Sequence, residues 1–319
     1  MKIIHIITGL EDGGAENTLY KICKYDLDNN SIVISLKGAG KYSSLLKKLG
    51  IKVYCFDMKY YSIIKFYFLI RLINTLKPDI VQTWLPHADF LGGIASRLAG
   101  VNKVVWNIRY SNLDNGVVKL KSIFLINILS KFSKIIPKMI IVNSKNGLQN
   151  CKYLGYSNDK LKLIHNGYDL INLRPNNKKN NIRKKLNIKK KTYLIGLVAR
   201  YDRTKDHDNL LNALYLVKKK NIKFFCVLIG KNIKNNILRK KINQLGLQKN
   251  LKLISKCKTI YTYLGELDIH LLSSKTEGFP NVVAEAMACG TPCVVTDVGD
   301  SAFIVGKTGW VVPSENSVK

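Results

Sequence analysis

The segment from Glu277 to Glu285 has residue types that could bind a diphosphate and a sugar. It reads Glu-Gly-Phe-Pro-Asn-Val-Val-Ala-Glu and follows a short strand expected over Ile269–Leu272. Pro280 and Asn281 favour the start of a helix, whose free backbone N–H groups and partial positive charge suit a diphosphate. Gly278 lets the backbone approach such a ligand closely. We therefore predict an anion site at this strand-to-helix turn.

Glu285 lies inside that expected helix, among Val, Ala and Met side chains. A buried carboxylate is costly unless it has a partner. A pair of sugar hydroxyls would be such a partner, and backbone N–H groups or a salt bridge would be others. The sequence leaves these alternatives open.

A second polar cluster follows a strand expected over Tyr193–Ala199. Arg200 and Lys205 would lie on the loop at the carboxyl end of this strand. Together they could hold a diphosphate without a metal ion, so we expect neither a metal nor another cofactor. A basic loop that merely faces solvent is the alternative.

The first expected strand, Lys2–Ile7, leads into a loop that contains Gly13 and Gly14. This loop does not have the GxGxxG pattern, so a dinucleotide dehydrogenase is poorly supported. The two glycines still allow a phosphate or sugar to approach the N-terminus of a helix expected over Ala15–Tyr25. Alone, this signal is weak.

These loops connect alternating strands and helices, a pattern that predicts βαβ units and the parallel sheets of an α/β protein. A polar stretch at 172–191, rich in Asn, Lys and Arg, separates two such series. We therefore predict two Rossmann-like domains, at 1–168 and 169–319, that face a central cleft. Ligands of such sheets bind beyond the carboxyl ends of the strands.

The formal net charge is +31, and both halves of the chain contribute to it. Such a charge attracts nucleic acid, an anionic membrane or phosphorylated substrates, and a general excess of lysine is the alternative explanation. The seven cysteines include no CxxC pair, which favours reduced thiols in a cytoplasmic enzyme. The N-terminal residues lack a signal-peptide pattern, so we expect no such peptide.

Two segments, 58–77 and 119–138, combine apolar residues with several lysines or arginines. The interrupting charges argue against helices that span a membrane. Basic amphipathic helices rest among lipid headgroups, so we expect contact with an anionic membrane surface. The alternative is that each apolar stripe packs on a sheet.

Four blocks of the sequence stand out together: GGAE (13–16), HNGYD (165–169), ARYDRTKDH (199–207) and EGFPNVVAEAMACGTPCV (277–294). They resemble glycosyltransferase family 4, whose members are retaining enzymes of the GT-B fold. The order and spacing of the blocks match the family over essentially the whole chain, and the Glu-x7-Glu element is highly specific. Members that build capsule, O-antigen or lipopolysaccharide are the most similar.

The resemblance implies a role for each matching residue. Arg200 and Lys205 would stabilise the leaving diphosphate. Glu277 would contact the donor sugar, and Glu285 would hold the ribose hydroxyls. His87 falls where many members place a histidine that faces the sugar. The remaining matches are loop residues near the donor phosphates and sugar: Gly13, Gly14, Gly278, Phe279, Pro280 and Asn281.

The sequence departs from the family pattern in two places. Arg109, at the end of a strand expected over 103–108, stands where many members have a histidine, and the resemblance gives it no role. Family chains also usually continue through several helices beyond Val312 and Pro313. We therefore expect that the C-terminal end is truncated and lacks the closing helices.

The matches imply a retaining glycosyltransferase that moves a hexosyl or N-acetylhexosaminyl group from a nucleotide diphosphate sugar, expected to be a UDP-sugar. The expected acceptor is a lipid-linked or growing surface polysaccharide, and the protein would be peripheral on the inner face of the cytoplasmic membrane. A nucleotide-sugar 2-epimerase of the same fold is an alternative that needs no acceptor. A basic nucleic-acid-binding protein is another, but no aromatic-basic motif supports it, so we expect no nucleic-acid partner.

Overall fold

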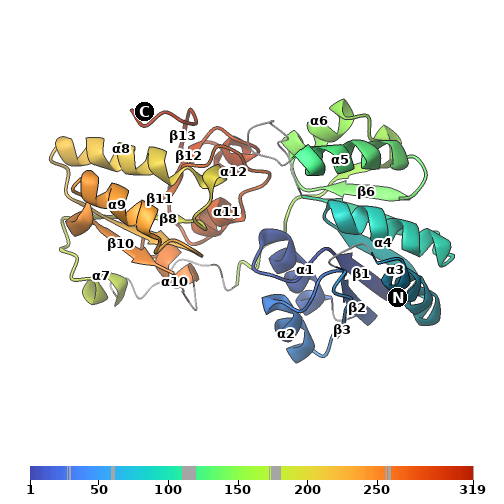
Figure 1. The fold of residues 1–319 in the computed structure, drawn as a ribbon. Coiled ribbons are helices and arrows are strands. Elements are labelled where there is room, and N and C mark those ends of the chain that lie inside the picture. The colour runs from blue at the N-terminus through green and yellow to red at the C-terminus, as the bar shows by residue number, and fades with distance from the viewer. Residues whose placement is uncertain are drawn as a thin grey trace. The chain divides into compact units, whose positions relative to one another are not determined.

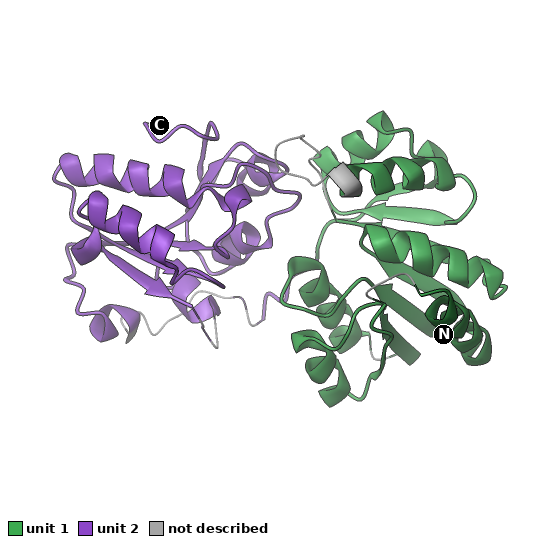
Figure 2. Ribbon diagram, in the orientation of Figure 1, with its two compact units in different colours: residues 1–166 green, residues 167–319 purple. Residues whose placement is uncertain are grey.

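The computed structural model describes residues 1–26, 28, 30–58, 62–109, 120–171, 173, 181–255, 257 and 260–318. The chain divides into two compact units, Met1–Asn166 and Gly167–Lys319 (Figure 2). Each unit is a parallel β-sheet flanked by helices (Figure 1), as the alternating sequence pattern predicts.

The first unit contains a seven-stranded sheet in the order β3-β2-β1-β4-β5-β6-β7. The strand order reverses between β1 and β4, and ligands of open α/β sheets bind beyond the carboxyl ends of the strands at such a point. Alternate residues of β1 enter different apolar clusters, Ile4 and Ile6 on one face and Ile7 on the other. The strands are β1 Lys2–Ile7, β2 Asn30–Ser35, β3 Lys52–Cys55, β4 Ile80–Trp84, β5 Val104–Ile108, β6 Met139–Val142 and β7 Leu161–Leu163.

Helices cover both faces of this sheet. Leu19 of α1 and Leu46 of α2 pack into one apolar cluster, whereas α3, α4 and α5 contribute to the other. On that second face α3 packs against α4, and α4 packs against α5. The helices are α1 Gly14–Tyr25, α2 Lys41–Lys48, α3 Ile63–Leu76, α4 Pro86–Leu98, α5 Leu120–Phe132 and α6 Lys145–Tyr153.

The second unit contains a six-stranded sheet in the order β10-β9-β8-β11-β12-β13. Its strand order reverses between β8 and β11, again at the centre of the sheet. Leu194 of β8 joins one core cluster, whereas Ile195 and Leu197 join the cluster on the opposite face. The strands are β8 Tyr193–Val198, β9 Phe224–Ile229, β10 Leu251–Ile254, β11 Ile269–Leu272, β12 Cys293–Thr296 and β13 Trp310–Val312.

Helices α8 and α9 cover one face of the second sheet, and α10, α11 and α12 cover the other. Asp206 caps the N-terminus of α8, because its Oδ1 accepts a hydrogen bond from the Asn209 N–H at 3.2 Å. The helices are α7 Asn181–Lys185, α8 His207–Lys219, α9 Asn236–Gln244, α10 Ile260–Leu264, α11 Asn281–Ala288 and α12 Ser301–Val305.

All seven cysteines are free thiols, and five of them are buried. Burial raises the pKa of Cys23 and of Cys151 to about 12. A thiol with such a pKa carries almost no nucleophilic thiolate at neutral pH, so these cysteines serve packing. Within the described ranges, no helix combines the length and the apolar character needed to cross a membrane.

Candidate functional site

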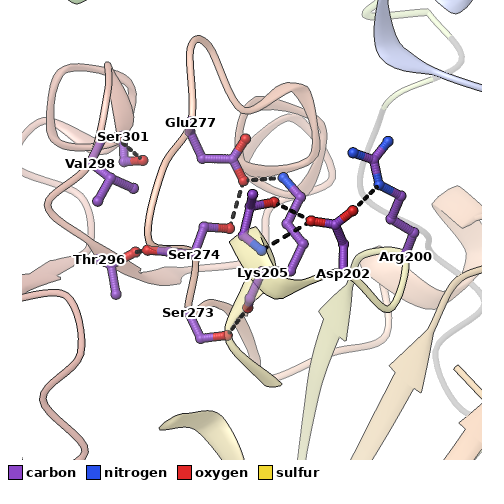
Figure 3. Close-up of polar contacts among 10 residues, drawn as sticks. Arg200, Asp202, Lys205, Ser273, Ser274, Glu277, Thr296, Val298 and Ser301 are labelled. Atoms are coloured by element: carbon purple, nitrogen blue, oxygen red, sulfur yellow. Dashed lines mark hydrogen bonds and ion pairs between the residues drawn. The ribbon is translucent and has the colours of Figure 1, made fainter. Parts of the chain in front are cut away.

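Three loops of the second unit converge at the carboxyl edge of its sheet (Figure 3). They follow β8, β11 and β12, which are neighbours in the sheet and run parallel, so their carboxyl ends lie side by side. Lys205 from the first loop and Glu277 from the second form an ion pair with 2.5 Å between Nζ and Oε1. The two side chains are only 20% and 12% exposed.

Glu277 is held by residues that come directly after β11. The Ser274 hydroxyl donates to the same Oε1 atom at 2.6 Å, and Ser274 itself is buried. The hydroxyl of Thr296, at the end of β12, in turn donates to the Ser274 carbonyl at 2.7 Å. The carboxylate therefore has a fixed place relative to two strands of the sheet.

The Lys205 loop is fixed through its backbone. The Ser273 hydroxyl donates to the Lys205 carbonyl, and the Lys275 N–H donates to the Thr204 carbonyl, both at 2.8 Å. Asp202 accepts hydrogen bonds from the N–H and the hydroxyl of Thr204, at 3.0 Å and 2.8 Å, and so begins a single turn of 3₁₀ helix over Arg203–Lys205. These contacts present the lysine at a fixed point.

Arg200 lies on the same loop but is less restrained than Lys205 (Figure 3). Its side chain is 56% exposed, and its Nε donates to Asp202 Oδ2 at 3.3 Å. Burial acts to raise the pKa of Asp202, but the hydrogen bonds from Thr204 and the nearby Arg200 outweigh it, so the pKa lies below its usual value. The carboxylate thus stays charged and keeps the guanidinium beside the site.

Helix α11 begins directly after the Glu277 loop, with Pro280 at its N-cap and no capping hydrogen bond from that side chain. Asn281 opens the helix, and its Oδ1 accepts a hydrogen bond from the Tyr168 hydroxyl at 2.9 Å. Glu285 follows within the same helix and is 8% exposed. Gly278 and Phe279, which lie between Glu277 and α11 in the chain, are half-buried. The expected strand-to-helix turn is present, and the roles of its residues toward a ligand stay predictions.

Gly299, in the loop after β12, packs closely against the Glu277 loop. Its φ of +56° favours glycine, and an added Cβ would lie 2.3 Å from the Glu277 carbonyl oxygen. The neighbouring Asp300 N–H donates to the Gly278 carbonyl at 3.0 Å. The third loop therefore supports the backbone of the second one.

We expect the substitution Gly299→Ala to destabilise the second unit and to displace this loop. Gly306→Ala is the matched control, because Gly306 has φ +54° but open space around an added Cβ. The control should cost about 1 kcal/mol of unfolding free energy from backbone strain. Gly299→Ala should cost about 2 kcal/mol more, because the backbone contact adds an overpacking term. Urea unfolding of the second unit measures both, and equal losses would contradict the proposed contact.

In the first unit, the predicted glycines and histidine lie near the start of two helices. Gly13 is the N-cap residue of α1 and Gly14 its first residue. His87 is the second residue of α4, which follows Leu85 with an unusual φ of +75°. Burial, and then the charge of Lys37, lower the pKa of His87, so its imidazole is neutral at pH 7. A neutral imidazole can donate a hydrogen bond to a sugar hydroxyl or accept one from it.

Arg109 has a more defined setting than the sequence indicated. Its guanidinium carbon lies 4.9 Å from the centre of the Trp84 ring, and its Nε donates to Asn107 Oδ1 at 3.0 Å. An Nη1 hydrogen bond reaches the Thr18 hydroxyl of α1 at 3.4 Å, and another reaches Asn166 Oδ1 at the end of the first unit. Arg109 thus connects β5, α1 and the last residue of this unit.

Sequence reasoning missed the residues that support the site. Ser273 and Ser274 directly follow a buried strand, which is the one signal that could have indicated them. Gly299 and Asp300 act from a loop that lies more than twenty residues later in the chain, and their contacts depend on the sheet order β11-β12. A sequence pattern alone does not supply that order.

Comparison with known proteins identifies the family. Residues 12–171 match the model of Glycosyltransferase Family 4, and residues 178–319 match that of Glycosyl transferases group 1. Since the first match covers half of the chain, the chain belongs to glycosyltransferase family 4. This confirms the resemblance noted in the sequence.

Individual relatives are more distant. The chain is 28% identical to the UDP-Gal:alpha-D-GlcNAc-diphosphoundecaprenol alpha-1,3-galactosyltransferase of Escherichia coli over 255 residues, which cover 78% of this chain and 64% of the relative. The chain thus spans less than two thirds of that relative's length. It is 26% identical to the capsular polysaccharide biosynthesis glycosyltransferase CapH of Staphylococcus aureus, over 90% of this chain and 78% of CapH.

Among solved structures, Anabaena Alr3699/HepE in complex with UDP and glucose is similar, with a TM-score of 0.87 at 21% sequence identity. The likeness covers 99% of this chain and 87% of that chain. At this identity it shows the fold alone. The fold class predicted from the sequence, two Rossmann-like α/β domains of the GT-B type, is confirmed.

Proposed function

We propose that this chain transfers a hexosyl or N-acetylhexosaminyl group from a nucleotide diphosphate sugar with retention of configuration. The observation that carries the proposal is the Lys205–Glu277 pair, 2.5 Å apart, beside the N-terminus of α11. A fixed cation and a helix N-terminus suit a leaving diphosphate, and a carboxylate suits the hydroxyls of a sugar. Membership of glycosyltransferase family 4 supports this assignment.

We propose a UDP-sugar as the donor. The HepE structure contains UDP and glucose, and the name of the E. coli relative specifies UDP-Gal. In this chain Glu285 is the buried carboxylate that would accept hydrogen bonds from both ribose hydroxyls. Helix α11 would then place the base and ribose at Glu285 and the diphosphate at its own N-terminus.

In the proposed reaction, a hydroxyl of the acceptor attacks C1 of the donor sugar on the face from which the diphosphate departs. The bond between C1 and the β-phosphate oxygen breaks, and a bond between C1 and the acceptor oxygen forms. The departing phosphate takes the hydroxyl proton, so UDP is released. Lys205 and Arg200 would stabilise the charge that grows on the phosphate. Because these two cations would supply the positive charge that a leaving diphosphate needs, we propose that no metal is required.

We propose that the acceptor is a lipid-linked or growing surface polysaccharide. The E. coli relative is named for an acceptor with a diphosphoundecaprenol group, and CapH is named for capsule biosynthesis. In the first unit His87, Arg109 and the Gly13–Gly14 turn lie at the carboxyl edge of the sheet, where ligands of such sheets bind and where we propose that the acceptor binds.

The test is a transfer assay with labelled UDP-sugars and a short-chain lipid-diphosphate sugar in detergent, with EDTA present. NMR of the product reports the anomeric configuration, and we expect the configuration of the donor to be retained. An inverted product would contradict the mechanism. An epimerised sugar formed without any acceptor would instead identify a 2-epimerase.

A further inference from the structure

Helix α3 presents large apolar side chains to solvent. Ile63 is 85% exposed, Ile64 68%, Tyr67 56% and Phe68 53%. Exposed apolar residues are common singly, but a cluster on one surface usually marks an interaction site.

The exposed residues form one continuous face of the helix. At about 100° per residue, positions 63, 64, 67, 68 and 71 fall within an arc of roughly 140°. Leu69 and Ile73 lie on the opposite side and are fully buried in the core of the first unit. The solvent face therefore contributes little to packing within the unit, and the alternative that all apolar residues of this segment pack on the sheet does not hold.

The charges around this face complement an anionic surface. Neither 62–76 nor 120–138, the segments that contain α3 and α5, has an aspartate or glutamate. Arg71 is exposed and lies 6.0 Å from the Tyr67 ring, where an aromatic and a cation can share a headgroup region. Lys131 and Lys134 are exposed at and just beyond the end of α5.

The first turn of α3, which contains Ile63 and Ile64, lies at the carboxyl edge of the first sheet, where the proposed acceptor would bind. In a βαβ unit the helix runs antiparallel to its strands, so α3 and α5 begin at the carboxyl edge, after β3 and β5. Ile63 and Ile64 are the first residues of α3, and Phe124, near the start of α5, is 68% exposed. Both helices pack against α4 on the same face of the sheet.

We propose that this face of α3, together with the exposed Phe124 of α5, inserts among the headgroups of an anionic bilayer and holds the first unit at the membrane. The proposal rests on the proposed function for its acceptor, because a lipid-linked sugar lies in the same plane as the headgroups. The surface would then bring the carboxyl edge of the first sheet to the depth at which the acceptor is presented. The expected partner of this face is a lipid surface. Binding of a second copy of the chain to the same face is the competing outcome of the test.

The test is co-flotation with phosphatidylglycerol–phosphatidylcholine vesicles and with vesicles of phosphatidylcholine alone. Wild-type protein should float with the anionic vesicles. The double variant Ile64→Ser with Phe68→Ser should lose at least about tenfold in vesicle affinity, because two apolar side chains no longer insert. Ile237→Ser on α9, at an isoleucine that is 70% exposed, is the matched control and should bind vesicles like wild type. Arg71→Glu should weaken binding to the anionic vesicles and leave binding to the phosphatidylcholine vesicles unchanged.

Two outcomes would overturn the proposal. One is a double variant that floats as well as wild type. The other is light scattering that shows a wild-type dimer and a monomeric double variant, because the face would then be a subunit interface. Transfer to the short-chain acceptor in detergent separates this proposal from the proposed function. If the wild type floats but transfers no sugar in detergent, the proposed function fails while the membrane surface stands.

Discussion

Replacing Lys205 by alanine should lower kcat for sugar transfer about 10²- to 10³-fold, the effect of removing one fixed charge from a developing anion. The lysine is tied to the sheet by the Ser273 hydroxyl on its carbonyl, and its Nζ is 2.5 Å from Glu277. It therefore needs little reorganisation when charge grows on the leaving phosphate. Steady-state kinetics with saturating UDP-sugar would measure the loss.

The control for this variant is Lys241→Ala, which also removes an ion-paired lysine, but one on α9 that contacts Asp208 at 3.0 Å. It should keep the wild-type rate within about twofold, because surface ion pairs contribute little. Lys205→Arg retains the charge and should recover part of the activity. If Lys205→Ala turned over as fast as the wild type, the assignment of the leaving-group cation would be wrong.

Glu285→Gln should raise the Kd for UDP roughly 10- to 100-fold, because hydrogen bonds to a charged acceptor contribute about 1.5–3 kcal/mol. Glu285 is 8% exposed within α11, so solvent screens its interactions poorly. The wild type should also bind 2′,3′-dideoxy-UDP much more weakly than UDP. The variant should bind the two nucleotides almost equally, since the group that distinguishes them is gone.

Glu315→Gln is the control for a lost carboxylate, because Glu315 is exposed and pairs with Lys275. Its UDP affinity should match that of the wild type. Thermal unfolding of each variant shows whether the second unit is intact. A Glu285→Gln variant that is folded and still prefers UDP over the dideoxy nucleotide would place ribose recognition elsewhere.

Much of the fold follows from sequence pattern alone. The strands predicted over Lys2–Ile7 and Ile269–Leu272 are largely apolar runs bounded by polar turns, and the structure has them at the expected residues. The strand predicted over Tyr193–Ala199 ends one residue earlier, at Val198, and helix α8 begins at His207 because Asp206 caps it. Strand ends and caps depend on single hydrogen bonds, which periodicity does not determine.

Other elements were not predicted, for a different reason. Strand β7 has only three residues, with Lys162 in its middle, and it exists because β6 provides a hydrogen-bonding edge. Helices α2 and α9 are short and rich in lysine, so their apolar stripes are narrow. Tertiary contacts decide such segments.

The sequence indicated the charged residues of the candidate site but not the residues that support them. The sequence indicated Lys205 and Glu277 separately, and the structure joins them in one ion pair. Ser274 and Gly299 escaped notice because serines and glycines have no distinctive pattern, and their roles require neighbouring parallel strands. The sequence marked Arg109 only as a position that departs from the family pattern. Its contacts with Thr18 and Asn166 depend on the packing of the first unit, which the sequence does not reveal.

The proposed donor site is best tested by calorimetric titration of the chain with UDP, GDP and ADP in EDTA. We expect saturable binding of UDP at one site without metal, a clear preference for UDP over GDP and ADP, and markedly weaker binding of UDP to Glu285→Gln. Absence of binding by all three nucleotides in a folded wild-type protein would contradict the donor site, and binding that appears only when a divalent metal is added would contradict the role of Lys205 and Arg200.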